Sequence, residues 1–306
     1  MRFSFTEDQL ALAAGLRDLL DSECPLSAVR AVWDAGSGHD AELWSKLDGM
    51  GVLGLLVPES AGGFGAGEVE AVLVWQELGR AAVPGPVLEH MVAAPIVGGD
   101  APLTVWFDGP YVAHAQVAGS ILTRDSLITR WSAEEHEAID GGRHLATVTP
   151  IETRPLAHDD ALAFDRAALG AAAMLIGLSE RMIELAGDYA RQRQQFGKPI
   201  GAFQAVKHLM ADALLQVEFA KPAAYRAAWS CASGDPNRTR DVSMAASLAA
   251  EASYRASRHC MQVHGGIGYT WEADLQLLMK KAWALSRAFG DASWHRRRVA
   301  AAVLGA

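Results

Sequence analysis

Two side chains suited to holding a flat anion lie close together in the segment YARQRQQFGKPIGAFQAVKHLMAD, residues 189–212. Arg193 offers a fork of donors to a phosphate oxygen, and Phe196 can pack against a ring face. Gly197 and Pro199 predict a tight turn beside them. We interpret the segment as a binding site. The alternative is a helix C-terminus, where solvated arginines favour the negative end of the macrodipole.

A second group with the same potential lies in QVHGGIGYTW, residues 262–271. Gln262 supplies an amide, and Gly265 and Gly266 lack a Cβ, so their backbone can approach a phosphate or sugar closely. Read alone, this segment is equally typical of a helix C-cap.

The composition limits what these groups can bind. The chain has 306 residues, half of them hydrophobic, and a formal charge of −9. It can bury a large core, and its charge argues against nucleic acid as a partner. The N-terminus is too acidic for a secretory signal, and the longest nearly apolar run, residues 167–178, is too short to span a bilayer, so we expect a cytoplasmic protein. Cys24, Cys231 and Cys260 are far apart, which predicts reduced structural thiols.

Three zones differ in their sequence pattern. Residues 1–100 have helical periodicity, with Thr6 as the N-cap of the first helix, and GGFGAG at residues 62–67 reads as a loop because no βαβ pattern surrounds it. Residues 101–157 are rich in β-branched residues and turn signals. Residues 158–306 contain four long amphipathic stretches with short connections. We predict a mainly α protein with an N-terminal helical domain, a shortened middle β segment and a C-terminal four-helix bundle.

Four segments resemble the flavin-dependent acyl-CoA dehydrogenases: the two described first, LGLLVPESAGGFGAG (residues 53–67) and ELGRAAVPGP (residues 77–86). The resemblance implies an oxidoreductase and flavoprotein of lipid metabolism. It also implies FAD contacts across a subunit interface from Arg193, Phe196 and Gln204, with Gln262, Gly265 and Gly266 as a second contact zone.

Two features expected from this family are missing. The middle zone is short and lacks the family's Ser/Thr-rich FAD-binding turn, so we expect this chain to hold its own FAD poorly or not at all. The family's catalytic carboxylate occupies one of two positions, which the resemblance places at Phe289 and Ala167. The nearest acids are Asp291 and Asp165. Asp165 should face away from Ala167, because two residues correspond to about 200° of helix rotation, and Asp291 is better explained as an N-cap or turn residue.

These features favour one role and leave two others open. The chain resembles the short partner subunit of actinobacterial hetero-oligomeric, steroid-type acyl-CoA dehydrogenases, which implies a longer homologue as partner. The alternatives are a self-sufficient acyl-CoA dehydrogenase with a relocated base, assembled with itself, and a flavin-free structural or regulatory paralogue. We expect His208 and His264 to have core or interface roles, and the arginines at residues 296–298 to be solvated or paired with acids of another subunit. No metal site is predicted.

Overall fold

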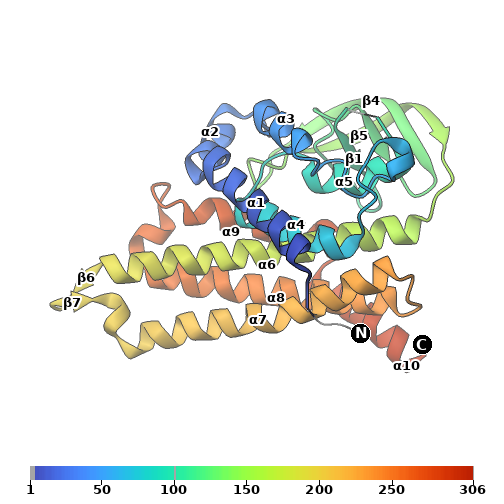
Figure 1. The fold of residues 1–306 in the computed structure, drawn as a ribbon. Helices are drawn as coiled ribbons and strands as arrows, with labels where there is room; N and C mark the ends of the chain where they lie inside the picture. The colour runs from blue at the N-terminus through green and yellow to red at the C-terminus, as the bar shows by residue number, and fades with distance from the viewer. Residues whose placement is uncertain (1–3, 100, 306) are drawn as a thin grey trace.

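The structure is a computed structural model, and it describes residues 4–99 and 101–305. The first three residues of the expected N-terminal domain, its residue 100 and the last residue of the bundle lie outside the described residues. The chain is mainly helical, with a small sheet between two helical zones, and this confirms the predicted fold class. Figure 1 shows the long helices α6, α7 and α8 lying side by side beneath the N-terminal helices and the sheet.

The N-terminal zone consists of α1 (Glu7–Glu23), α2 (Leu26–Ala35), α3 (Ala41–Gly49), α4 (Glu68–Arg80) and α5 (Val87–Val97). The Thr6 side chain accepts a hydrogen bond from the Gln9 backbone, and the Gln9 side chain accepts one from the Thr6 backbone. This capping box confirms the predicted start of α1. The GGFGAG segment is a loop that leads into α4, as expected.

The middle zone is a five-stranded sheet in the order β1-β3-β4-β5-β2. Its strands are β1 (Leu103–Val105), β2 (Val112–Ala113), β3 (Ser120–Leu122), β4 (Ser126–His136) and β5 (Leu145–Pro155). Only the β1–β3 pair is parallel among these neighbours. The C-terminal parts of β4 and β5 are mostly exposed, because β3 pairs only near the start of β4 and β2 only near the start of β5.

The C-terminal zone begins with α6 (Asp160–Gln192), a hairpin of β6 (Gln194–Gln195) and β7 (Lys198–Pro199), and the short helix η2 (Ile200–Ala202). It continues with α7 (Gln204–Ala232), α8 (Arg238–His264), the short helix η3 (Gly265–Tyr269), α9 (Leu275–Ala288) and α10 (Ala292–Leu304). The prediction of a single fourth long helix is therefore wrong, because this stretch forms two helices, α9 and α10. The stretch breaks at Gly290, whose positive φ of 94° cannot continue a helix.

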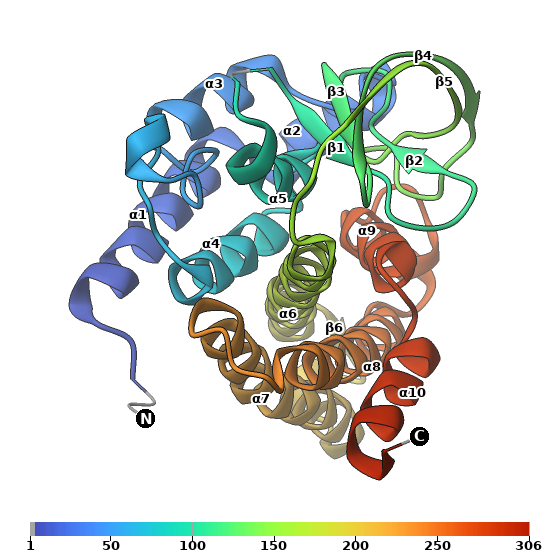
Figure 2. The ribbon, with the colours of Figure 1, turned by 90° about the vertical axis from the view of Figure 1, so that its right-hand side faces the viewer.

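Helix α6 is the centre of the molecule. Figure 2 looks along it and shows α4, α7, α8 and α9 arranged around it, all of which contact it. By length and composition α6 could cross a membrane, but 83% of its most apolar window is buried inside the protein, as in a core helix. Helices α4 and α6 approach closely at two glycines. A Cβ on Gly177 would lie 1.9 Å from the Gln76 carbonyl oxygen, and one on Gly79 would lie 2.2 Å from that of Met174.

Candidate functional site

The turn between α6 and α7 presents the aromatic ring that the sequence singled out. Strands β6 and β7 form a two-residue hairpin with Phe196 and Gly197 at its tip, at φ values of 52° and 77°. Two positive φ values in succession are typical of a type I′ turn. The left-handed conformation costs a residue other than glycine about 1–2 kcal/mol, and the Phe196 side chain is 92% exposed. An aromatic ring held in this way is displayed to the surroundings and contributes little to the core.

Arg193 lies at the base of the same hairpin. Its backbone N–H donates to the Tyr189 carbonyl at 2.8 Å, and its own carbonyl accepts from Ile200 at 2.8 Å. These two bonds fix the backbone where α6 ends. Within residues 4–99 and 101–305, the exposed guanidinium of Arg193 has no hydrogen bond or ion pair. Its donors are therefore available to a ligand or a second subunit.

The second predicted group lies at the same end of the bundle, at the end of α8. Gly265 has a positive φ of 62°, and a Cβ on Gly265 or Gly266 would meet no atom within 4 Å. The rings of Tyr189 and His264 stack with centroids 4.7 Å apart, which joins the last turn of α6 to the last turn of α8.

We call this set, which is exposed apart from half-buried Gly265, the bundle-end surface: Arg193, Phe196, Gln204, Gln262, Gly265 and Gly266. Its chemistry fits part of a dinucleotide such as FAD. It combines a free guanidinium for a phosphate, an exposed ring for packing, two amides, and backbone that nothing covers. It is an open face and not a cradle, so it can supply only some of the contacts that such a ligand needs. All six residues that the sequence predicted to bind a cofactor lie at this end of the bundle, and their role in binding a cofactor stays a prediction.

The position expected for a catalytic base at the end of α9 is filled by a hydrocarbon side chain. Phe289 is 7% exposed. The cavity beside it, which Phe289, Gly290 and His295 line together with residues of α6 and α8, measures about 10 Å³. That is about the minimum for one water molecule. The second expected position, Ala167, is completely buried. Neither position has a carboxylate.

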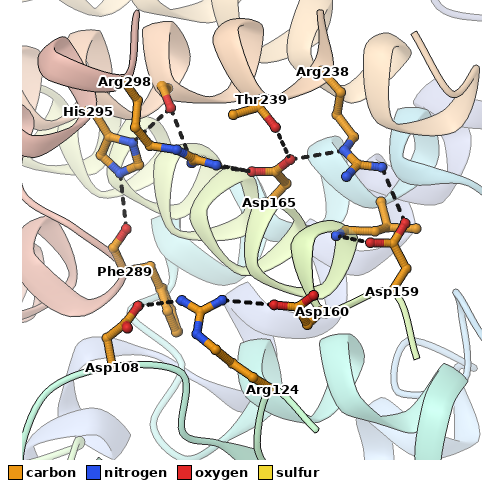
Figure 3. Close-up of polar contacts among 12 residues, drawn as sticks. Asp108, Arg124, Asp159, Asp160, Asp165, Arg238, Thr239, Phe289, His295 and Arg298 are labelled. Carbon is orange, nitrogen blue, oxygen red and sulfur yellow. Dashed lines mark hydrogen bonds and ion pairs between the residues drawn. The ribbon is translucent and has the colours of Figure 1, made fainter. Parts of the chain in front are cut away.

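Asp165 is held in a network of ion pairs (Figure 3). Its buried carboxylate accepts hydrogen bonds from Arg238 Nε at 2.9 Å and Thr239 Oγ1 at 3.0 Å, and Arg298 Nη2 lies 3.3 Å from its other oxygen. Asp165 and Ala167 are both completely buried. Every oxygen of Asp165 has a cationic partner, which leaves none for proton abstraction.

Asp291 caps the N-terminus of α10. Its side chain accepts a hydrogen bond from the Trp294 backbone N–H at 2.7 Å, and this bond holds the pKa of Asp291 below its usual value. The geometry agrees with the N-cap interpretation. A carboxylate with a lowered pKa is a weak base, so the structure gives no support to Asp291 as the catalytic base.

The structure also places the arginines at residues 296–298, the two histidines and the three cysteines that the sequence analysis discussed. The arginine run was expected to be solvated or to pair with another subunit. This is wrong for Arg298, which is 24% exposed and pairs with Asp165 of the same chain, whereas Arg296 and Arg297 are exposed and Arg296 also pairs with Glu251. His264 Nδ1 contacts the Cys260 carbonyl at 2.8 Å, in line with a core role, whereas His208 is exposed. The three cysteines are free and buried, and burial raises the pKa of each thiol.

Comparisons with known proteins place this geometry in context. The family model described as acyl-CoA dehydrogenase, C-terminal domain, matches residues 159–304, and the one described as acyl-CoA dehydrogenase, N-terminal domain, matches residues 6–99. The acyl-CoA dehydrogenase IpdE2 of Mycolicibacterium smegmatis is 34% identical over 316 residues, covering 97% of this chain and 99% of the relative.

Two similar solved structures contain pairs of proteins. One chain of the ChsE4–ChsE5 complex from Mycobacterium tuberculosis is 25% identical, with a TM-score of 0.87 over 100% of both chains. One chain of the Tcur3481–Tcur3483 steroid ACAD is 24% identical, with a TM-score of 0.86 over 98% of both, a likeness that shows the fold.

Proposed function

Because the chain belongs to the acyl-CoA dehydrogenase family, whose members are FAD-dependent flavoproteins, we propose that it is the short subunit of a hetero-oligomeric acyl-CoA dehydrogenase. A longer homologue carries the catalytic base and most of the FAD site. This chain completes that site from its bundle-end surface and has no base of its own. The assembly oxidises an acyl-CoA thioester to its α,β-unsaturated form.

One observation carries the proposal: the chain's own base position is occupied by buried Phe289 beside a cavity of about 10 Å³. A base for this reaction must reach the proton α to the thioester carbonyl, within hydrogen-bond distance. A phenyl ring cannot accept a proton, and the two nearest acids are engaged as an ion-pair centre and as a helix cap.

The bundle-end surface supports the second half of the proposal. Arg193 would donate to a pyrophosphate oxygen, a charge-assisted contact of about 1.5–3 kcal/mol. Phe196 would pack on a ring, and the uncovered backbone at Gly265 and Gly266 would approach a phosphate or ribose. Bound FAD supplies the hydride acceptor of the reaction. Arg193, Phe196 and Gly266 are exposed in the single chain and Gly265 is half-buried, which leaves them accessible to contacts across a subunit interface.

The remaining parts of the proposal rest on likeness. Similar structures include the ChsE4–ChsE5 complex, and this supports a second acyl-CoA dehydrogenase as partner. A steroid side-chain thioester is the proposed substrate because one similar fold is described as a steroid ACAD. We also propose a cytoplasmic location and a division into domains at residues 1–100, 101–157 and 158–306.

The test is the FAD content of this chain alone and with a co-expressed longer homologue. We expect no stoichiometric flavin in the isolated chain and one FAD for each short and long pair. In the complex, Arg193→Ala should weaken FAD retention by about 1–3 kcal/mol. Arg191→Ala is the matched control, because exposed Arg191 lies on the same helix end and pairs with Asp188. Stoichiometric FAD in the isolated chain, or equal losses in the two variants, would refute the proposal.

The same experiment separates the alternatives. A self-sufficient enzyme would be yellow when purified alone and would reduce an artificial acceptor with an acyl-CoA, and this activity would fall in Asp291→Asn. A flavin-free paralogue would assemble with its partner without changing the flavin content of that partner.

A further inference from the structure

A cavity of about 260 Å³ lies between η3 and the first half of α9, at the same end of the bundle as the hairpin β6–β7 (Figure 1). Its walls consist largely of aromatic rings and methionine side chains: Tyr269, Trp271, Trp283, Met261 and Met279. The described residues that line it include none from the sheet, none from the bundle-end surface and not Phe289, which follows the far end of α9. A concave space with mostly apolar walls is typical of a small-molecule site, and this volume suits one small ring system.

Two of the rings in the wall are held in place. The Trp283 Nε1 donates a hydrogen bond to Ser257 Oγ at 3.3 Å. The loop that bears Trp271 is fixed by Gln276, whose Nε2 donates to the Trp271 carbonyl at 3.1 Å. The Trp271 side chain nevertheless stays 67% exposed. The cavity is therefore formed before any ligand arrives, and binding requires little ordering of side chains.

Lys280 is the only charged residue among the described residues of the wall. Its Nζ lies 3.9 Å from the centroid of the Trp271 ring and 5.6 Å from that of the Trp33 ring. In the part of the chain that the structure describes, it donates to Gln276 Oε1 at 3.2 Å and has no acidic partner. Partial burial lowers the pKa of Lys280, because the ammonium group loses water and no carboxylate compensates its charge. One uncompensated positive charge therefore borders the cavity.

We propose that this cavity binds an aromatic monocarboxylate. Its ring packs among the three aromatic side chains, and its carboxylate accepts hydrogen bonds from Lys280. Aromatic walls favour a ring through stacked or edge-to-face contacts, and methionine sulfur adds favourable contacts with ring edges. One negative charge matches the one uncompensated ammonium group. A cationic ligand is disfavoured, because Lys280 already occupies the position over the Trp271 ring that a cation would take.

The test is isothermal titration of the full chain with cinnamate, and with cinnamamide as a neutral ligand of nearly the same shape. We expect cinnamate to bind and cinnamamide to bind at least about tenfold more weakly, because it lacks the charge that Lys280 compensates. Lys280→Gln should weaken cinnamate binding by about tenfold and leave cinnamamide binding unchanged. Lys207→Gln is the matched control, because Lys207 is an exposed lysine with no ion pair in the described residues.

A second pair of variants tests the place of binding. Trp271→Ala removes a ring from the wall, whereas Phe219→Ala removes an equally exposed ring, also 67%, that does not line the cavity. Trp271→Ala should weaken cinnamate binding by at least about tenfold and Phe219→Ala should not, with the melting temperature of both close to that of the wild type.

Four results would overturn the proposal. These are no binding of cinnamate, equal binding of cinnamamide, equal weakening in the two lysine variants, and unchanged binding in folded Trp271→Ala. Should Trp271→Ala not fold, the lysine pair decides. All measurements use the single chain without flavin or partner, so their failure would leave the proposed function untouched.

Discussion

The substitution Asp165→Asn should destabilise the protein strongly, because Asp165 is the shared partner of two arginines. Its carboxylate is completely buried and contacts Arg238 at 2.9 Å and Arg298 at 3.3 Å. Removing one member of a buried ion pair typically costs about 3–5 kcal/mol, since the remaining charge stays uncompensated. The side chains of Arg238 and Arg298 are 19% and 24% exposed, so water can solvate them in part. We therefore expect a loss near the lower limit, about 3 kcal/mol.

The assay is urea unfolding of the wild type, Asp165→Asn and Asp291→Asn, with the free energy of unfolding taken from the midpoint and slope. Asp291→Asn removes the same charge from an exposed helix cap, where Asn is about as good as Asp, so its midpoint should hardly change. A loss below about 1 kcal/mol in Asp165→Asn, or equal losses in the two variants, would contradict the ion-pair interpretation. A fully stable Asp165→Asn that abolishes turnover of the complex would instead make Asp165 the base.

Three further predictions concern the core. Phe289→Glu in the isolated chain should give no turnover of octanoyl-CoA with an artificial electron acceptor, because the chain alone is proposed to lack the FAD that accepts the hydride; measurable turnover would contradict this. Burial lowers the pKa of His114 to about 3 and of His295 to about 4, from an ordinary value of 6.5. The free energy of unfolding should therefore be highest above pH 6.5 and should decrease as the pH falls toward 4, by up to about 1.4 kcal/mol per pH unit for each histidine. Equal urea midpoints at pH 7 and pH 5 would argue against it. Gly177→Ala should destabilise by about 3 kcal/mol through overlap with the facing helix, whereas Gly187→Ala in the same helix, with nothing closer than 3.7 Å, should not; similar melting temperatures would refute the close contact.

The sequence predicted the elements whose signals are local. Thr6 with Gln9 three residues later marks the start of α1, and long periodic stretches mark α6, α7 and α8. The sequence did not predict α5 as a separate helix, because α5 is apolar on nearly every side and therefore shows no helical period. The sequence did not predict α2 as a separate helix either, because α2 follows Pro25 and has no side-chain cap to mark its start. The break at Gly290 had a signal, since Asp291 directly after a glycine is typical of a new helix start.

The site shows the same division between local and distant information. Arg193 and Phe196 could be singled out because one short segment contains both. The partial burial of Lys280 beside the cavity could not be predicted, because Trp33, which lies against it, comes from a distant segment and only the fold brings the two together. The burial of Asp165 could not be predicted either, because it depends on how many helices surround α6.

The contact between α4 and α6 has a consequence for how the chain is made. Trp75 and Leu78 on α4 are completely buried, and Glu68 pairs with Arg166, 98 residues further along the chain. A ribosome adds about 5–20 residues per second, so α4 emerges roughly 5–20 s before its partner helix. During that interval the face of α4 that bears Trp75 and packs against α6 lacks its partner helix, although α1, which also contacts α4, is already made. Slow translation before residue 160 would prolong this exposure and favour capture by chaperones or aggregation over folding.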